Sequence, residues 1–345
     1  MSSLVIKYPA PAADLPVVPV PDFKAGPVSE KANHVSAMRS AIEKCATPCT
    51  QLGSLGIPKR NEILGSWFKE GDLGFIFAPR GLGKTWLALG VSTAIAGGKS
   101  CGPWQAHGAR RVLYVDGEMP AESVTQRIEG MGGDENLVVL NHEILFHLAE
   151  GLTLNLANPH TQEALLSFVL ASGVQVLVLD NLSCLFSGVS ENDADSWEAV
   201  KHWLLKLRRH RVAVVVIHHA GRNKEMRGTS RREDDVFWII RLDETGGDQR
   251  QGARFLSRFT KDRNSQTEQQ PVEWQFVTGE DGVVRVTTRA ASSLDVFRQW
   301  IEDGLTSAND LSVEMGVSKG TISKWAKKAI EAGWLKKEGR EYALV

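Results

Sequence analysis

Cysteine is scarce in this chain, and its few thiols are not paired. The 345 residues include four cysteines, Cys45, Cys49, Cys101 and Cys184, and no two of them stand at a C-x-x-C spacing. A secreted disulfide scaffold or a cysteine-rich metal site would need closer and more regular pairs. We therefore expect free thiols and a fold that depends on its apolar core.

Long apolar runs and an excess of charge are also missing. No apolar run is long enough to cross a bilayer, and residues 1–20 hold prolines without a charged stretch leading into an apolar one. Forty Lys and Arg face forty-one Asp and Glu, so any contact with nucleic acid has to come from local clusters. These absences predict a cytoplasmic protein with no membrane partner.

The remaining composition predicts three parts. An apolar content of 42% supports a large core with room for a small appendage. Residues 1–51 are rich in proline, which favours a largely flexible N-terminal segment, with a possible short helix at 34–45. We assign residues 52–290 to a large central domain and residues 291–345 to a small C-terminal domain.

Apolar runs alternate with helical patterns in the central part. Such alternation is typical of an α/β fold with a mostly parallel sheet flanked by helices. Later stretches alternate apolar and polar residues and predict antiparallel strands that complete the sheet. The first set of runs comprises residues 73–77, 111–115, 175–179, 212–217 and 236–242, and the second set comprises 253–260, 272–277 and 283–287.

A glycine-bearing loop follows the first apolar run and opens a helical pattern. Strand, loop and helix in this order form a P-loop, whose backbone N–H groups face a triphosphate. Lys84 would neutralise the phosphates of ATP, and the Thr85 hydroxyl would bind Mg²⁺. The expected nucleotide-binding residues are Ala78, Pro79, Arg80, Gly81, Leu82, Gly83, Lys84, Thr85 and Trp86.

Two carboxylates follow the next strands. Glu118 comes just after the run 111–115 and could polarise the water that attacks the γ-phosphate; alternatively, Asp116 or Glu118 caps the following helix. Asp180 ends four aliphatic residues, the Walker B pattern of a Mg²⁺ ligand. Their position after a P-loop predicts one site at the carboxyl edge of the sheet.

Histidine and basic residues follow later strands. His218 or His219 would report the γ-phosphate, or instead bond to nearby backbone. The loop 220–232 contains five cations that could grip DNA, contact phosphate on a neighbouring subunit or face solvent. Lys261 and Arg263 end another strand and could enter the site of an adjacent subunit.

The C-terminal part predicts three helices and a hairpin. This order is that of a winged helix-turn-helix, whose third helix lies in the major groove of DNA. Residues 318–340 carry seven basic and two acidic residues. DNA binding is the first interpretation, and a docking module with a solvated lysine face is the second.

The motifs and their order resemble the RecA-fold ATPases of the hexameric replicative helicase group, nearest to the RepA-like (AAA_25) ATPases. The resemblance covers residues 52–280 and is carried by these segments: APRGLGKT, VLYVDGEM, VLDNL, VIHHAG, RGTSRRED and KDRN. It implies that Lys84 and Thr85 bind nucleotide and Mg²⁺, and that Glu118 is the catalytic carboxylate. It also implies that Asp180 is the Walker B acid, His219 the sensor and Arg263 the finger, with Lys261 beside it.

The resemblance further implies a ring, most often a hexamer, with single-stranded DNA in its centre. The residues themselves support only the ATPase. A helicase or translocase is the first functional hypothesis, with duplex DNA at the winged helix. The second is an ATP-regulated DNA-binding regulator that does not unwind. A P-loop kinase of small metabolites is disfavoured, because it would not need a water-directing glutamate or a cationic finger.

Overall fold

The computed structural model describes residues 28–188, 194–220, 235–245, 252–302 and 304–345. The chain divides into two compact units, Met1–Arg60 and Asn61–Val345. Within the described residues, no helix has the length and apolar character that a membrane crossing requires.

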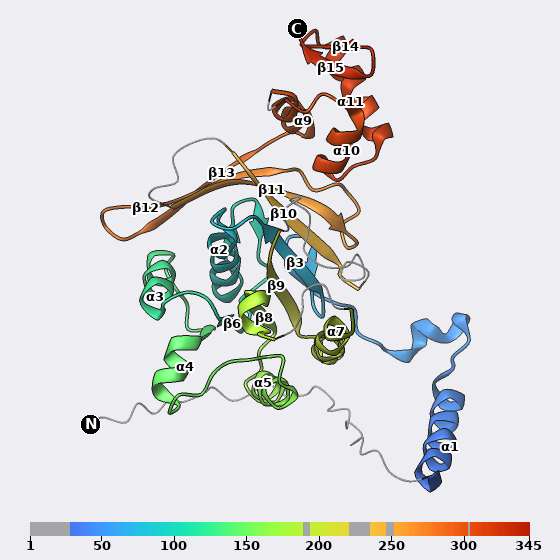
Figure 1. Cartoon of the computed structure of the whole chain (residues 1–345). Coiled ribbons are helices and arrows are strands. Elements are labelled where there is room, and N and C mark those ends of the chain that lie inside the picture. Colours follow the sequence, from blue (N-terminus) through green and yellow to red (C-terminus); the bar gives the residue numbers. More distant parts are fainter. Residues whose placement is uncertain (1–27, 189–193, 221–234, 246–251, 303) are drawn as a thin grey trace. The chain divides into compact units, whose positions relative to one another are not determined.

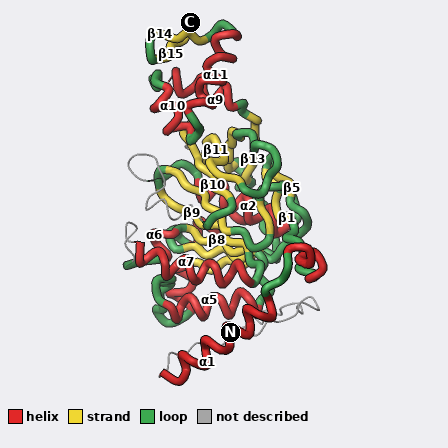
Figure 2. The backbone as a smooth tube through the Cα atoms, turned by 90° about the vertical axis from the view of Figure 1, so that its right-hand side faces the viewer, coloured by secondary structure: helices red, strands yellow, loops and turns green. Residues whose placement is uncertain are grey.

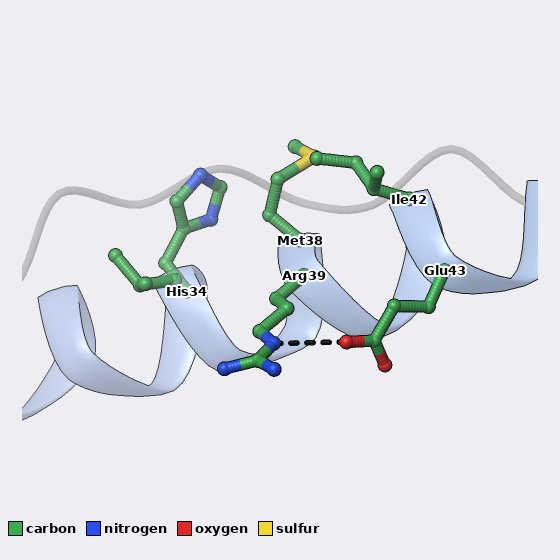
Figure 3. Close-up of a pocket in the computed structure, with 6 residues that line it drawn as sticks. His34, Met38, Arg39, Ile42 and Glu43 are labelled. Carbon is green, nitrogen blue, oxygen red and sulfur yellow. Dashed lines mark hydrogen bonds and ion pairs between the residues drawn. The ribbon is translucent and has the colours of Figure 1, made fainter. Parts of the chain in front are cut away.

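In the described part of the first unit, helix α1 spans Val28–Cys45 and a 3₁₀ helix spans Cys49–Leu55. Arg39 of α1 donates from Nε to Glu43 Oε1 at 2.9 Å, one turn further along the helix (Figure 3). Both side chains are exposed, so this ion pair supports the helix only weakly. The expected short helix at 34–45 lies within α1.

The second unit contains a nine-stranded sheet (Figures 1 and 2) with the order β13-β12-β11-β10-β3-β9-β8-β6-β7. The strands from β10 to β7 in this order run parallel, and β11, β12 and β13 are antiparallel. The strand bounds are β3 Leu73–Ala78, β6 Val112–Asp116, β7 Leu137–Asn141, β8 Val176–Asp180, β9 Ala213–His219, β10 Trp238–Glu244, β11 Gly252–Asp262, β12 Val272–Thr278 and β13 Val284–Ala290. The expected α/β fold with a mostly parallel sheet is confirmed.

Helices cover both faces of this sheet (Figure 1). Apolar residues of α2 pack on one face together with alternate residues of the parallel strands. Residues of α5 and α7 pack on the other face with the intervening strand residues. The helices of the core are α2 Lys84–Gly97, α3 Ala121–Gly130, α4 His142–Leu148, α5 Pro159–Ala171, α6 Leu182–Leu185 and α7 Ala194–Arg209. Because strand side chains alternate, successive residues of a strand point to opposite faces of the sheet. We call these the α2 face and the α7 face.

An aromatic cluster fills the α2 face near the antiparallel strands. Trp67 lies 4.7 Å from Trp238 between ring centroids, and Trp104 lies 4.9 Å from Trp274. Gly74 of β3 leaves room for Trp238, since a Cβ at this position would lie 2.1 Å from the indole. Two short hairpins supply Trp67 and Trp104 to this cluster: β1–β2 (Glu62–Leu64, Phe68–Lys69) and β4–β5 (Ser100–Cys101, Trp104–Gln105).

Three helices and a hairpin end the second unit: α9 Ser293–Glu302, α10 Ala308–Met315, α11 Lys319–Glu331, β14 Leu335–Glu338 and β15 Glu341–Leu344. Ser307 and Ser318 cap α10 and α11 with their side chains, and Gly316 ends α10 in the left-handed conformation. A separate apolar cluster holds these elements together and includes Leu256 of β11. The elements have the order of a winged helix-turn-helix.

All four cysteines are free thiols, as expected from their spacing.

Candidate nucleotide-binding site

The P-loop connects β3 to α2, and its glycines are required by the backbone. Gly81 and Gly83 have φ values of 77° and 102°, a region that suits glycine. A Cβ at Gly83 would also lie 2.7 Å from the ring of Phe255. Pro79, Arg80 and Gly81 are exposed, whereas Leu82 is buried. The loop therefore presents its backbone to solvent at the N-terminus of α2, where an anion is stabilised.

Lys84, the first residue of α2, folds back over this loop. Its Nζ donates to the carbonyl oxygens of Ala78, at 3.1 Å, and Pro79, at 2.7 Å. Burial lowers the pKa of Lys84 to about 8, and the negative charges of Asp180 and Glu118 oppose this shift. A phosphate placed here would favour the charged ammonium form and replace carbonyl contacts with ionic ones.

Asp180 lies at the end of β8 and is 2% exposed. Tyr114 of the neighbouring strand donates its hydroxyl to Asp180 Oδ2 at 2.6 Å, and Thr85 also forms a side-chain hydrogen bond with this carboxylate. Burial raises the pKa of Asp180 to about 6, against the two hydrogen bonds that lower it. The carboxylate and the Thr85 hydroxyl thus converge at the N-terminus of α2.

Asp116 lies beside Asp180 in the parallel register and organises the turn after β6. Its Oδ1 accepts hydrogen bonds from the backbone N–H groups of Glu118 and Met119, at 2.9 and 3.1 Å. Its Oδ2 accepts from Asn141 at 3.2 Å, and burial raises the pKa of Asp116. This residue therefore shapes the backbone that carries Glu118. It does not cap the following helix, because α3 has Pro120 at its N-cap and no side-chain cap.

Glu118 extends from that turn toward β8 and β9. Its side chain is 48% exposed, and its Oε2 lies 3.9 Å from Nε2 of His219. Asn181 donates from Nδ2 to the same carboxylate and also lies 3.2 Å from His219 Nε2. The carboxylate, the amide and the imidazole form one group at the carboxyl edge of three adjacent strands.

The alternation of β9 separates the two histidines. His219 follows Ile217, which packs on the α2 face, and lies opposite Ala78 in the register with β3. His218 follows Val216 on the α7 face, where its ring lies 6.5 Å from that of Phe75. The strand geometry therefore places His219 on the face that bears Lys84.

Trp86 and Arg127 form a pair beside the loop. The Arg127 guanidinium carbon lies 4.4 Å above the Trp86 ring centroid, and an Arg127 nitrogen also contacts the sulfur of Met119. Trp86 is half-buried next to Phe276, at 5.9 Å between ring centroids. Burial lowers the pKa of Arg127. This arrangement orders the side of α2 that faces α3.

Lys261 and Arg263 lie at the opposite end of the parallel strands. The Arg263 N–H donates to Phe237, whose own N–H donates to Leu73 at the start of β3. Ala78 lies five residues further along β3 than Leu73, a rise of about 17 Å along the strand. Lys261 is half-buried and Arg263 is exposed. Both side chains therefore lie far from the P-loop of their own chain.

The lysine residues of α11 form an exposed face. Lys319, Lys324, Lys327 and Lys328 are all exposed, and so are Lys336, Lys337 and Arg340 of the hairpin. Ile322, Ala326 and Ala329 of the same helix are buried against α9 and α10. The basic loop with Arg222, Lys224, Arg227, Arg231 and Arg232 lies outside the described residues, as do the prolines before residue 28.

Sequence reasoning missed three residues of this site. Tyr114 and Asn141 belong to strands, where their patterns indicate burial only. Asn181 directly follows the Walker B acid, and a polar residue in this position was the one available signal. Their contacts depend on strand register, which the sequence does not specify.

The fold and the loop define the class of the protein: it is a RecA-like P-loop ATPase. A family model described as "AAA domain" (AAA_25) matches residues 36–225, more than half of the chain, so the chain belongs to this family. The resemblance to RecA-fold ATPases of the AAA_25 family is thereby confirmed, whereas the helicase role that it implies stays a prediction.

The chain is similar to a KaiC-like protein of Pyrococcus horikoshii OT3, with 15% identity and a TM-score of 0.45, over 63% of this chain and 91% of that one. It is also similar to the flagellar accessory protein FlaH of Methanocaldococcus jannaschii, with 13% identity and a TM-score of 0.43, over 63% and 90%. No curated protein matches the chain.

Proposed function

We propose that this protein is an oligomeric, Mg²⁺-dependent ATPase that acts on DNA. One observation carries the proposal: Lys84, Thr85, Asp180 and Glu118 lie together with His219 at the carboxyl edge of adjacent parallel strands. Ligands of open α/β sheets bind at this edge. The acids and the lysine also have different environments, as separate roles in phosphoryl transfer require.

The chain's own residues can bind the triphosphate. The backbone N–H groups of residues 80–83 would surround it, and Lys84 would exchange its carbonyl contacts for the β- and γ-phosphates. Trp86, stiffened by Arg127, supports the first turn of α2. The α2 N-terminus adds the favourable end of the helix dipole.

The donor set at Asp180 fits Mg²⁺. The carboxylate and the Thr85 hydroxyl are oxygen ligands, the type that Mg²⁺ prefers, and their mutual hydrogen bond already brings them together. When bound, Mg²⁺ would neutralise phosphate charge. Tyr114 holds the Asp180 carboxylate in the required direction.

Glu118 is assigned the role of the base. Half of its side chain is accessible to solvent, so it can orient a water and accept its proton. His219 lies beside it and faces the same phosphate, which suits a sensor of the γ-phosphate. The hydrolysis of ATP then needs no acceptor other than water.

A neighbouring subunit supplies the missing cation in this proposal. Arg263 is exposed and about 17 Å along the strands from its own loop, which favours a role in the site of another subunit. Lys261 stands beside it at the same end of β11. A closed ring, with a hexamer favoured by the resemblance, would complete every site in this way.

DNA is the proposed partner, with duplex at α11 and single strands in the ring. The exposed lysines of α11 and the hairpin would neutralise backbone phosphates, and this predicts affinity that falls with salt. The three-helix order also supports the second function, a DNA-binding regulator whose ATPase does not unwind.

ATP turnover of the purified protein, measured without DNA, with single-stranded DNA and with duplex, tests the proposal. Stimulation by single strands together with strand displacement supports the helicase. Stimulation by duplex alone, without displacement, supports the regulator. Absence of turnover under all three conditions contradicts both functions.

A further inference from the structure

Asn181 is held between the proposed hydrolytic residues and a short helix, and its orientation is determined. The residue is 1% exposed, and its Oδ1 accepts a hydrogen bond from the backbone N–H of Cys184 at 3.1 Å. This bond caps α6. The opposite orientation of the amide would direct its NH₂ group at that N–H and its oxygen at the Glu118 carboxylate, so both contacts would become repulsive.

The NH₂ group therefore faces the site. One N–H donates to Glu118 Oε2, and the same nitrogen lies 3.2 Å from His219 Nε2. An amide nitrogen only donates, so His219 receives this contact through the lone pair of Nε2. One buried side chain thus touches both residues that face the γ-phosphate.

Glu118 depends on this contact for its direction. Asp116 orders the backbone N–H of Glu118, but the side chain beyond it is half exposed. Among the described residues, Asn181 is the hydrogen-bond donor to the carboxylate. A glutamate without such a partner would be distributed over several rotamers.

We infer that Asn181 is a positioning residue for hydrolysis. Its amide contacts both Glu118 and His219, and it directs the Glu118 carboxylate toward the water beside the γ-phosphate. This inference rests on the proposed ATPase function and names a residue that acts through Glu118. In this inference, hydrolysis depends on the NH₂ group of Asn181, whereas the Oδ1 atom only caps α6. Nucleotide binding through Lys84 and Thr85 does not depend on it.

Two substitutions separate the donor from the cap. Asn181→Ser and Asn181→Asp both keep an oxygen that can cap α6, and both remove the NH₂ donor. We expect kcat to fall about ten- to a hundredfold, the effect of losing a hydrogen bond to a charged group. The Asp variant should show the largest fall in kcat, because its charge repels Glu118. KM for ATP and the affinity for a fluorescent ATP analogue should stay near wild type, which also shows that the variants fold.

A Glu118→Gln background provides the control. If Asn181 acts through Glu118, Asn181→Ser should cause little further loss of turnover in this background. The inference is overturned if the Ser and Asp variants turn over ATP at the wild-type rate or faster, if the loss lies in KM, or if it is equally large in the Glu118→Gln background.

Failure of the ATPase function itself would look different. In that case Lys84→Ala would leave turnover unchanged. If Lys84→Ala abolishes turnover and Glu118→Gln lowers it strongly but measurably, while the Asn181 variants behave as wild type, only the role of Asn181 is wrong.

Discussion

Tyr114 donates its hydroxyl to Asp180 across two neighbouring parallel strands, at a distance of 2.6 Å. The tyrosine is fully buried, and its ring belongs to the apolar cluster on the α2 face. The bond lowers the pKa of Asp180, against the larger effect of burial. The tyrosine thus helps to keep ionised the carboxylate that would hold Mg²⁺.

Tyr114→Phe should raise the Mg²⁺ concentration that turnover requires. Without the hydroxyl, the pKa of Asp180 rises further above about 6, and Mg²⁺ then competes with a proton for the carboxylate. The Mg²⁺ concentration for half-maximal turnover should increase several-fold, about tenfold at most, near pH 6.5. The difference should shrink at pH 8.5, where the carboxylate is ionised in both proteins. Tyr342→Phe, which changes the buried tyrosine of β15, is the matched control. Equal Mg²⁺ curves at both pH values would contradict this role of Tyr114.

Asp180→Asn should stabilise the protein at neutral pH while it abolishes turnover. The pKa of Asp180 is raised from 3.8 to about 6, so the folded state binds the proton more tightly than the unfolded state does. Well below pH 3.8 the carboxyl is protonated in both states and costs nothing, whereas above pH 6 the buried charge costs up to roughly 3 kcal/mol. The free energy of unfolding of the Asn variant, measured in EDTA, should exceed that of wild type at pH 7.5. Most of the gain should be lost as the pH falls to 4, and a constant gain over this range would exclude burial of the charge as its cause.

The main elements of this fold could be predicted from the sequence because each depends on local pattern. The apolar runs before Ala78, Asp180 and His219 are fully buried strands in the structure. The strand β7 was missed, because its five residues are mostly half-buried and lead directly into α4. The short hairpins were missed for a similar reason, since their strands have two or three residues each.

The site residues, too, differ in how far the sequence could predict them. Lys84 and Thr85 are specified by the loop motif, whereas the partners of Glu118 and Asp180 depend on which strands become neighbours. The choice between His218 and His219 also required the register of β9 with β3. The roles of all these site residues, and those of Lys261 and Arg263, remain predictions.

Lys84→Ala should abolish ATP hydrolysis. The substitution removes the cation that neutralises the phosphates, and turnover should fall below about one thousandth of the wild-type rate. The side chain is buried, and among the described residues its hydrogen bonds go to two carbonyl groups of the loop, so the fold should be retained. Lys99→Ala removes an exposed lysine just beyond the opposite end of α2 and is the matched control. Phosphate release measures the effect, and unchanged release would remove the P-loop from the mechanism.

Arg263→Ala should leave nucleotide binding nearly intact and lower turnover about a thousandfold, the scale of a trans-acting arginine. The matched control is Arg209→Ala, which removes another exposed arginine at the end of α7. Mixing is the decisive measurement. In mixed rings, the Lys84 of an Arg263→Ala subunit can meet the Arg263 of a Lys84→Ala subunit, so two inactive proteins should regain part of the turnover. Because Arg263 lies about 17 Å along the strands from its own loop, an arginine acting within its own subunit is disfavoured. Should the mixture stay inactive although both variants assemble with wild type, Arg263 does not complete a neighbour's site.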